Sequence, residues 1–589
     1  MLIICVDSLA KRNTGKKKKQ RKSKEVRQKL QSKKLSRNYK IALVAIAAFA
    51  LIYSLVFIIG PSAYGDDPTY LSLAYGAATG NFIESSYIFS VRLFMIFPIA
   101  LFYKFFGVNL FTDSMWDILC FVGSVVASFY IGRELYDEKV GLLAAFLLSI
   151  FPLTAILAPT VSDNIPMMFM TTMAMLSILY AQRRSSKFWY FAAGIFLIAS
   201  PLVTPEGFII IPIAILYLLV ELFRKKISIN RTSLYLIYGI FTIGIALMAF
   251  NYINSGHPLI TYTANSNYFS AIGVIKNGAY VTIGSANQNL GFYPQWMLPY
   301  NILQITASNI SRFNFNPISI WDQIYVTNFN MAGFFFYALI LAALYLILRK
   351  EKRAYFVLSW FLAGFLYLEF GPMHFSLIPF EYLLTHRLPR FLTLIAVPTV
   401  IIIAMALVRW AEASKKQLCI LASKGASKIN LRTIPYSAMI AALIIVFLTI
   451  TSLQISFTQY EAMSLSRYDT FTISNYLNTL PNTTVIYYPA AYTQMFSNIG
   501  IYMHFDNLSR LRGLDNTQNC TYIPENSYVV LTKYAKIGSL NYTPDPLNQC
   551  PGWETVLYPN ASQNYSSAIT GYAYPFRAVL YYVKSNQSG

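Results

Sequence analysis

Apolar stretches of about 20 residues recur along the chain and are separated by short polar or basic segments. A helix of about 20 apolar residues is long enough to cross roughly 30 Å of lipid hydrocarbon. The pattern therefore predicts an α-helical polytopic membrane protein with about 11 transmembrane helices. The expected spans are 41–60, 113–131, 140–158, 164–181, 188–203, 207–223, 233–253, 331–348, 354–372, 391–408 and 433–454.

The distribution of charge sets the expected orientation. Of 589 residues only 12% are charged, against about 25% in soluble domains, which excludes an ordinary soluble enzyme. The net charge is +22, and 15 of the 47 Lys and Arg residues lie in residues 1–40. This run predicts a basic cytoplasmic tail on anionic lipid, with RNA binding as the alternative. We expect membrane lipid, and no nucleic acid, as a partner.

With the N-terminus in the cytoplasm, the predicted cytoplasmic segments hold 34 of the 47 basic residues, as the positive-inside rule requires. We therefore expect a multi-pass protein of the plasma membrane. The transmembrane domain, 41–454, then has long outer loops at 61–112, 254–330 and 373–390. The apolar segment Arg92–Gly107 in the first loop is interpreted as a re-entrant or interfacial helix, because a crossing there would turn later basic loops outward.

Residues 455–589 are expected to form a small extracytoplasmic α/β domain. Its strand-like segments are Thr484–Tyr488, Tyr528–Thr532, Thr555–Tyr558 and Ala578–Val583. Cys520 and Cys550 both fall here, where a disulfide persists, so we hypothesise that they pair. The domain also contains seven Asn-X-Ser/Thr sequences, which are glycan acceptors on exposed loops or products of an Asn/Ser/Thr-rich composition. They start at Asn482, Asn507, Asn519, Asn541, Asn560, Asn564 and Asn586.

Two adjacent acids, Asp66 and Asp67, follow the first predicted span. Neighbouring carboxylates are costly to desolvate, so they favour solvation, a bound cation or a proton donor. One interpretation is a general base that takes the proton of an acceptor hydroxyl. The alternative is a solvated turn, in which Asp67 caps a helix and Pro68 takes its first position.

Three more polar residues are predicted on the same outer side. They are Asp163, Glu206 and His257. Each has a structural alternative: Asp163 or Ser162 could cap the next helix, and Glu206 and His257 could be turn residues beside Pro or Gly.

Arginines near the outer ends of spans are candidate ligands for a lipid phosphate, which guanidinium groups bind through two hydrogen bonds. These candidates are Arg390, Arg387 and Arg92, and His386 lies next to Arg387. The alternative is that they snorkel to the head groups of bulk lipid. The predicted span centres are nearly free of charge, whereas a transport pathway would place charges inside them.

The order of these motifs resembles the GT-C fold glycosyltransferases, especially the protein mannosyltransferase and aminoarabinose transferase branch. A span precedes the acidic pair, and a long outer loop with an apolar helix follows it. Further short motifs follow in the same order over roughly residues 40–410. They are Gly132–Leu135, Phe151-Pro152, Ser162-Asp163, Asn254–Leu259 and His386–Phe391.

The resemblance implies inverting, single-displacement transfer of a monosaccharide from a polyprenyl-phosphate donor to an acceptor hydroxyl on the extracytoplasmic face. Asp66 would be the base on the acceptor, and Asp163 would orient the acceptor or bind a metal. Arg390 would stabilise the departing phosphate. Protein, glycan and lipid acceptors stay open, as does a divalent metal ion as cofactor.

The chain also departs from the family. The acidic pair is commonly Asp-Glu rather than Asp-Asp, and Glu206 stands where many members have a basic residue. The Trp-Trp-Asp-Tyr-Gly motif of the oligosaccharyltransferase branch is absent from the sequence, which disfavours transfer of whole glycans. A lipid or solute transporter and a non-catalytic membrane scaffold stay open as other functions.

Overall fold

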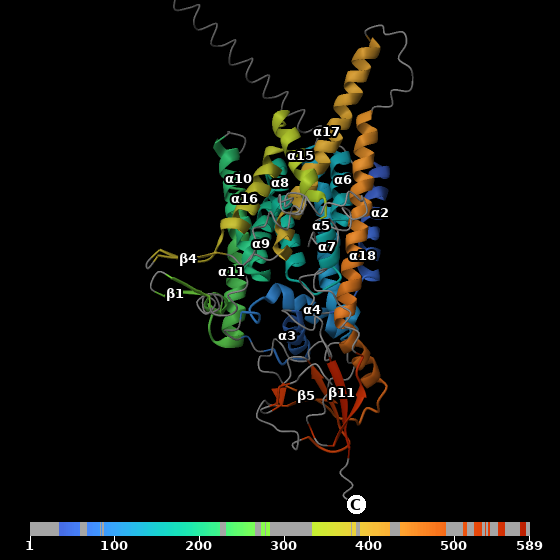
Figure 1. Ribbon diagram of the computed structural model, residues 1–589. Helices are drawn as coiled ribbons and strands as arrows, with labels where there is room; N and C mark the ends of the chain where they lie inside the picture. Colours follow the sequence, from blue (N-terminus) through green and yellow to red (C-terminus); the bar gives the residue numbers. More distant parts are fainter. Residues whose placement is uncertain are drawn as a thin grey trace, which may run out of the picture. The chain divides into compact units, whose positions relative to one another are not determined.

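A computed structural model describes the chain in segments (Figure 1). They are residues 35–58, 60, 67–82, 84, 88–223, 231–264, 273–276, 279–282, 333–377, 380–384, 389–423, 436–489, 510–514, 523–532, 536–537, 540–541, 550, 552–559 and 578–584. The chain divides into two units, residues 1–45 and 46–589. Of the basic tail, residues 1–34 lie outside the described part.

Most of the described chain is helical. The helices are α2 Arg37–Val56, α3 Asp67–Thr79, α4 Leu93–Phe106, α5 Leu110–Leu135, α6 Glu138–Ser149, α7 Pro152–Leu157, α8 Asn164–Arg184, α9 Lys187–Val203, η1 Pro205–Ile209, α10 Ile210–Phe223, α11 Leu234–Ser255, α15 Phe335–Leu348, α16 Tyr355–Phe370, η4 Pro389–Ile395, α17 Ala396–Ser423 and α18 Tyr436–Asn478. Six helical segments are long and apolar enough to cross a membrane. They are Arg37–Val56, Leu110–Leu135, Asn164–Arg184, Leu234–Ser255, Arg390–Ala413 and Ser437–Phe457. This architecture confirms the predicted fold class.

The prediction of one continuous helix over 140–158 is wrong. Helix α6 ends at Ser149, and Phe151 has an extended backbone before Pro152 opens α7. A proline disfavours helical geometry in the residue before it and lacks the N–H that a continuing helix needs. The break leaves a short helix and a loop that lead to Asp163.

Helix α5 starts at Leu110 because its first turn is capped. The Asn109 side chain accepts hydrogen bonds from the backbone N–H groups of Phe111 and Thr112, and the Thr112 hydroxyl accepts one from the Asn109 N–H. This reciprocal arrangement satisfies N–H groups that a helix start leaves unpaired. It places Asp113, Ser114 and Asp117 in the first turns of a mostly apolar helix.

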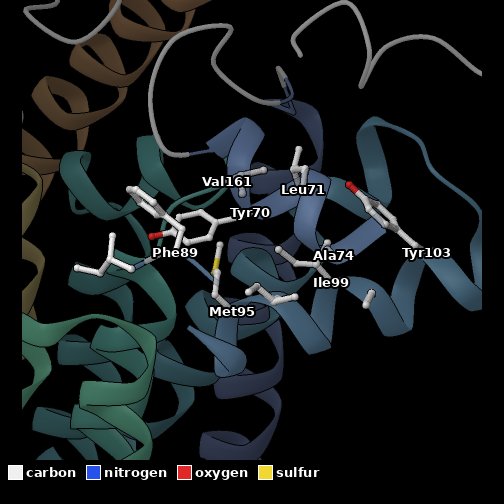
Figure 2. Packing of buried hydrophobic residues seen from close by; sticks show 11 residues of the cluster. Tyr70, Leu71, Ala74, Phe89, Met95, Ile99, Tyr103 and Val161 are labelled. Carbon is white, nitrogen blue, oxygen red and sulfur yellow. The ribbon is translucent and has the colours of Figure 1, made fainter. Parts of the chain in front are cut away.

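A compact apolar cluster holds α3 and α4 together (Figure 2). Its labelled members are Tyr70, Leu71 and Ala74 from α3, Met95, Ile99 and Tyr103 from α4, and Phe89 and Val161 from the segments before α4 and α8. Every one of these side chains is less than a tenth exposed. Close packing of this kind fixes the start of α3 relative to the loop before α8.

The C-terminal region contains a five-stranded sheet in the order β10-β11-β7-β5-β6. Its strands are β5 Ile486–Pro489, β6 Leu511–Leu514, β7 Tyr528–Thr532, β10 Trp553–Leu557 and β11 Ala578–Val583. Strand β5 is parallel to β6 and β7, and the other two pairs are antiparallel. The four predicted strand segments are confirmed, because each overlaps one of these strands.

Helix α18 continues to Asn478 and joins the sheet directly. Its Ile473 and Leu477 are buried in one cluster with Ile486, Val530 and Leu580 of the sheet. Cys550 is disulfide-bonded. Its predicted partner, Cys520, lies outside the described residues, so that pairing stays a prediction.

The described residues also form three two-stranded antiparallel sheets. They join β1 Gly273–Lys276 to β2 Ala279–Thr282, β3 Pro372–Leu377 to β4 Phe380–Leu384, and β8 Lys536–Ile537 to β9 Leu540–Asn541.

Candidate functional site

Asp163 is the centre of the best-defined polar site in the described part of the chain. It precedes α8, yet its carboxylate makes no capping hydrogen bond to that helix. Oδ1 accepts a hydrogen bond from Asn164 Nδ2 at 2.8 Å, and Oδ2 accepts one from the Tyr70 hydroxyl at 3.2 Å. Oδ2 also forms an ion pair with Arg92. Because the side chain is 3% exposed, these contacts replace water as its partners.

Arg92 comes from the residue directly before α4 and is largely buried. Its guanidinium donates to the Tyr70 hydroxyl as well as to Asp163. It also lies over two rings, 5.0 Å from the centre of Phe89 and 5.6 Å from the centre of Tyr70. Aromatic faces attract cations, so the rings and the carboxylate together hold the guanidinium in place.

Glu206 brings a second carboxylate to this arginine. It interacts electrostatically with Arg92 and Asp163, and its Oε2 accepts a hydrogen bond from the Thr204 hydroxyl. The 3₁₀ turn that carries it packs tightly, because a Cβ added at Gly207 would lie 2.5 Å from the Ser200 backbone. Glu206 therefore belongs to the polar site as well as to the turn.

Helix α5 holds the loop that carries Asp163. The Ser114 hydroxyl donates to the carbonyl of Pro159 at 2.8 Å, and the Ser162 backbone N–H donates to Asp117 Oδ1 at 3.3 Å. Asp117 is fully buried and interacts electrostatically with Asp163 and with Asp67. Two α5 side chains thus fix the loop on either side of Thr160.

Asp67 is the first residue of α3, which agrees with the expected helix start. Asp67 interacts electrostatically with Asp117, which also interacts with Asp163, so Asp67 lies near the Asp163 site. Asp66 lies outside the described residues. The site therefore combines Asp67, Asp163 and Glu206, all predicted from sequence, with Arg92.

Sequence reasoning missed the contributions of Tyr70, Asn164 and Asp117. Asp117 had a usable signal, since an acid within an apolar helix is a functional candidate by default. Tyr70 and Asn164 had none, because a Tyr in a helix and an Asn at a helix start are ordinary.

The remaining predicted residues have other contacts in the described part of the chain or lie outside it. Arg390 is in η4, with its guanidinium 5.7 Å from the centre of the Phe391 ring. His257 is exposed in the turn after α11, and its backbone N–H donates to Ser255 Oγ at 3.2 Å. Arg387 and His386 lie outside the described residues.

The described side chains offer no ready metal site. Among them, no three His, Cys, Asp or Glu residues are grouped so that they could hold a metal ion. Asp66 is not part of that set, so a divalent cation stays an open hypothesis. The arrangement instead brings two carboxylates, Asp163 and Glu206, to the guanidinium of Arg92, and Asp117 interacts with Asp163.

Comparison with known proteins agrees with this picture. Residues 90–250 match the dolichyl-phosphate-mannose-protein mannosyltransferase family, a range that includes Arg92, Asp163 and Glu206. The match confirms the resemblance to this branch of glycosyltransferases over those residues. No functionally curated protein matches the chain by sequence.

Two solved structures align with most of the chain at low sequence identity. ArnT from Cupriavidus metallidurans bound to undecaprenyl phosphate has 12% identity and a TM-score of 0.47, over 93% of this chain and 98% of that chain. The oligosaccharyltransferase AglB from Archaeoglobus fulgidus, in complex with an inhibitory peptide and a dolichol-phosphate, has 14% identity and a TM-score of 0.47. That match covers 84% of this chain and 70% of AglB.

Proposed function

We propose that this protein is a membrane glycosyltransferase that moves a monosaccharide from a polyprenyl-phosphate donor to an acceptor hydroxyl on the extracytoplasmic face. The match of residues 90–250 to the dolichyl-phosphate-mannose-protein mannosyltransferases supports the reaction class and the donor class. The acceptor is a protein, a glycan or a lipid, and the transfer inverts the configuration of the sugar.

One observation carries the proposal: the buried Asp163 carboxylate is held by Arg92 and Tyr70, within electrostatic reach of Asp117. A buried ion pair is weak evidence for stability, because desolvation of the two charges offsets their attraction. Its presence where α3, α4 and α8 begin is better explained by chemistry at that place.

The proposed mechanism begins with the acidic pair. Asp66 takes the proton from the acceptor hydroxyl while that oxygen attacks the anomeric carbon of the donor sugar. Asp67 and Asp163 orient the acceptor. The bond from the sugar to the lipid phosphate breaks, and Arg390 and Arg387 stabilise the negative charge that develops on the departing phosphate.

Arg92 has two candidate roles. The sequence suggested that it binds the donor phosphate, and this stays a prediction. Its ion pair with Asp163 favours a role in holding that carboxylate. The two roles are compatible, because a guanidinium has five N–H donors and can serve two anions at once.

Sidedness supports the assignment to the extracytoplasmic face. Basic residues concentrate in segments predicted to be cytoplasmic, and the acidic pair and the C-terminal sheet are then predicted on the opposite side. Reporter fusions after Gly107 and after Tyr582 test this placement. Fusions that report opposite sides of the membrane would refute it.

The decisive experiment is a transfer assay. Purified protein in lipid nanodiscs is incubated with radiolabelled dolichyl-phosphate mannose, or with a labelled undecaprenyl-phosphate sugar, and a membrane extract as acceptor. We expect label to move to acceptor with wild type and transfer to fall at least about a hundredfold in Asp66→Asn, as is typical for loss of a general base. Glu554→Gln, an exposed carboxylate on β10, is the matched control and should transfer normally.

Two results would contradict the proposal. If the folded wild-type protein transfers neither sugar, the proposed reaction class is refuted. Equal transfer by wild type and Asp66→Asn would remove Asp66 as the base.

A transporter is the second candidate, because Asp113 and Asp117 are buried within α5. Both lie in the first eight residues of that helix rather than at its centre. The same assay separates the two, since a transporter would leave the labelled sugar on its lipid.

A further inference from the structure

We propose that Tyr70 is a positioning residue that holds the start of α3, and with it Asp67, against the Asp163–Arg92 ion pair. The inference rests on the proposed function, because positioning matters only if the acidic pair does chemistry. Tyr70 was chosen from the contacts it makes, since nothing in its sequence surroundings marks it out.

The hydroxyl of Tyr70 lies between the two charged groups. It donates to Asp163 Oδ2 at 3.2 Å and accepts a hydrogen bond from Arg92. The side chain is 1% exposed, so water does not compete for these bonds. One hydroxyl thus connects α3 to the residue before α4 and to the residue before α8.

The ring of Tyr70 is fixed as firmly as its hydroxyl. It packs edge-on against Phe89, with 5.4 Å between ring centres, and beneath the guanidinium of Arg92. Figure 2 shows the Tyr70 ring among the side chains of the apolar cluster, with its oxygen beside Phe89. The ring therefore has little freedom to swing, and the hydroxyl position follows from the helix position.

The geometry of α3 passes this restraint to Asp67. Residues three apart on a helix lie on the same side, so Asp67 and Tyr70 share one side of the first turn. In the proposed mechanism Asp67 orients the acceptor. A shift of that turn by about 1 Å would misplace this carboxylate, and shifts of this size can cost about a hundredfold in rate.

The same molecule offers a matched control. Tyr103, in α4, belongs to the same apolar cluster, is also buried, and donates its hydroxyl to a buried carboxylate, Asp113 Oδ1, at 2.6 Å. Figure 2 shows both tyrosines in one view. Removal of either hydroxyl is the same chemical change in the same environment, but only the Tyr70 hydroxyl contacts Asp163.

The test compares Tyr70→Phe and Tyr103→Phe in nanodiscs. Because phenylalanine keeps the ring and its packing, both variants should fold. We expect Tyr70→Phe to lower kcat about tenfold with KM for the donor within about twofold, the pattern of a lost transition-state arrangement. We expect Tyr103→Phe to keep kcat within about twofold of wild type. Backbone hydrogen–deuterium exchange over residues 67–79 should be faster in Tyr70→Phe alone.

A double-mutant cycle with Asp163→Ala separates positioning from simple packing. If Tyr70 acts through Asp163, the combined variant loses no more kcat than Asp163→Ala by itself. If the kcat loss of the combined variant instead equals the product of the two single-variant losses, the proposal is overturned.

Two other results would also overturn the proposal. One is that hydrogen–deuterium exchange over residues 67–79 in Tyr70→Phe is as slow as in wild type. The other is that Tyr70→Phe and Tyr103→Phe lose kcat equally. If the wild-type protein transfers no sugar, it is the proposed function that is refuted. The exchange experiment would still show whether Tyr70 holds α3.

Discussion

Glu84 is a buried carboxylate whose titration should alter stability in the physiological pH range. It lies between α3 and α4, outside the apolar spans, and is 3% exposed. Within the described part of the chain, neither of its carboxylate oxygens has a hydrogen-bond partner. Burial therefore raises the pKa of Glu84 from 4.5 to about 7, since the charged form is poorly solvated there.

The sign follows from proton binding. The folded protein keeps Glu84 protonated up to about pH 7, whereas the unfolded chain releases this proton near pH 4.5. The resulting stabilisation is complete below pH 4.5 and is lost as pH rises through about 7. A shift from 4.5 to about 7 corresponds to at most roughly 3.4 kcal/mol. Screening by nearby solvent reduces this, so we expect about 1–2 kcal/mol.

The perturbation is Glu84→Gln, which keeps the shape and removes the titration. We expect the variant to match wild type near pH 5 and to be more stable by about 1–2 kcal/mol at pH 8. Thermal unfolding in detergent at both pH values measures the difference. The exposed Glu554, 3.1 Å from Lys584, gives the control Glu554→Gln, whose difference from wild type should be small at both pH values. An unchanged difference between Glu84→Gln and wild type from pH 5 to pH 8 would refute the reasoning.

Two further predictions concern packing and the loop before α8. Gly239→Ala should destabilise the protein by about 1–3 kcal/mol, because the added Cβ would lie 2.2 Å from the carbonyl oxygen of Phe191. Gly244→Ala on the same helix meets no atom within 4 Å and should cost nothing, and melting temperatures compare the two. Asp117→Leu should destabilise the protein by about 1–3 kcal/mol, because it leaves the buried Ser162 N–H unpaired. Asp117→Asn keeps an acceptor for that N–H, so equal melting temperatures of the two Asp117 variants would contradict this prediction.

The long helices were predictable because their signal is local. Hydrophobic runs set α5, α8 and α11 to within a few residues, and short runs of β-branched, aromatic and other apolar residues predicted β7 and β11. The extension of α18 to Asn478 was not predictable in the same way. Beyond Phe457 the helix becomes more polar, and it is stabilised by Ile473 and Leu477 packing on a sheet that lies later in the chain.

The candidate site was predictable as a set of residues but not as an arrangement. Asp163 and Arg92 were both recognisable, because charges are rare in this chain. Their pairing joins residues 71 positions apart, and no periodic pattern encodes contacts over that distance. The alternative that Asp163 caps α8 fails for the same reason, because Arg92 and Tyr70 take its carboxylate. The other residue of that alternative, Ser162, accepts a hydrogen bond from the Asn164 backbone N–H at 3.4 Å.

The charge balance of the site links its fold to its proposed chemistry. Asp67, Asp117, Asp163 and Glu206 interact with one another or with Arg92. Asp163 and Glu206 share the single guanidinium of Arg92 in a region of low dielectric, so the two carboxylates depend on one cation. In the proposed reaction the proton passes from the acceptor hydroxyl to Asp66, and the negative charge of that carboxylate reappears on the departing lipid phosphate. Arg92 therefore links the fold to the proposed chemistry, because it compensates the buried charge of Asp163 and holds that carboxylate in place.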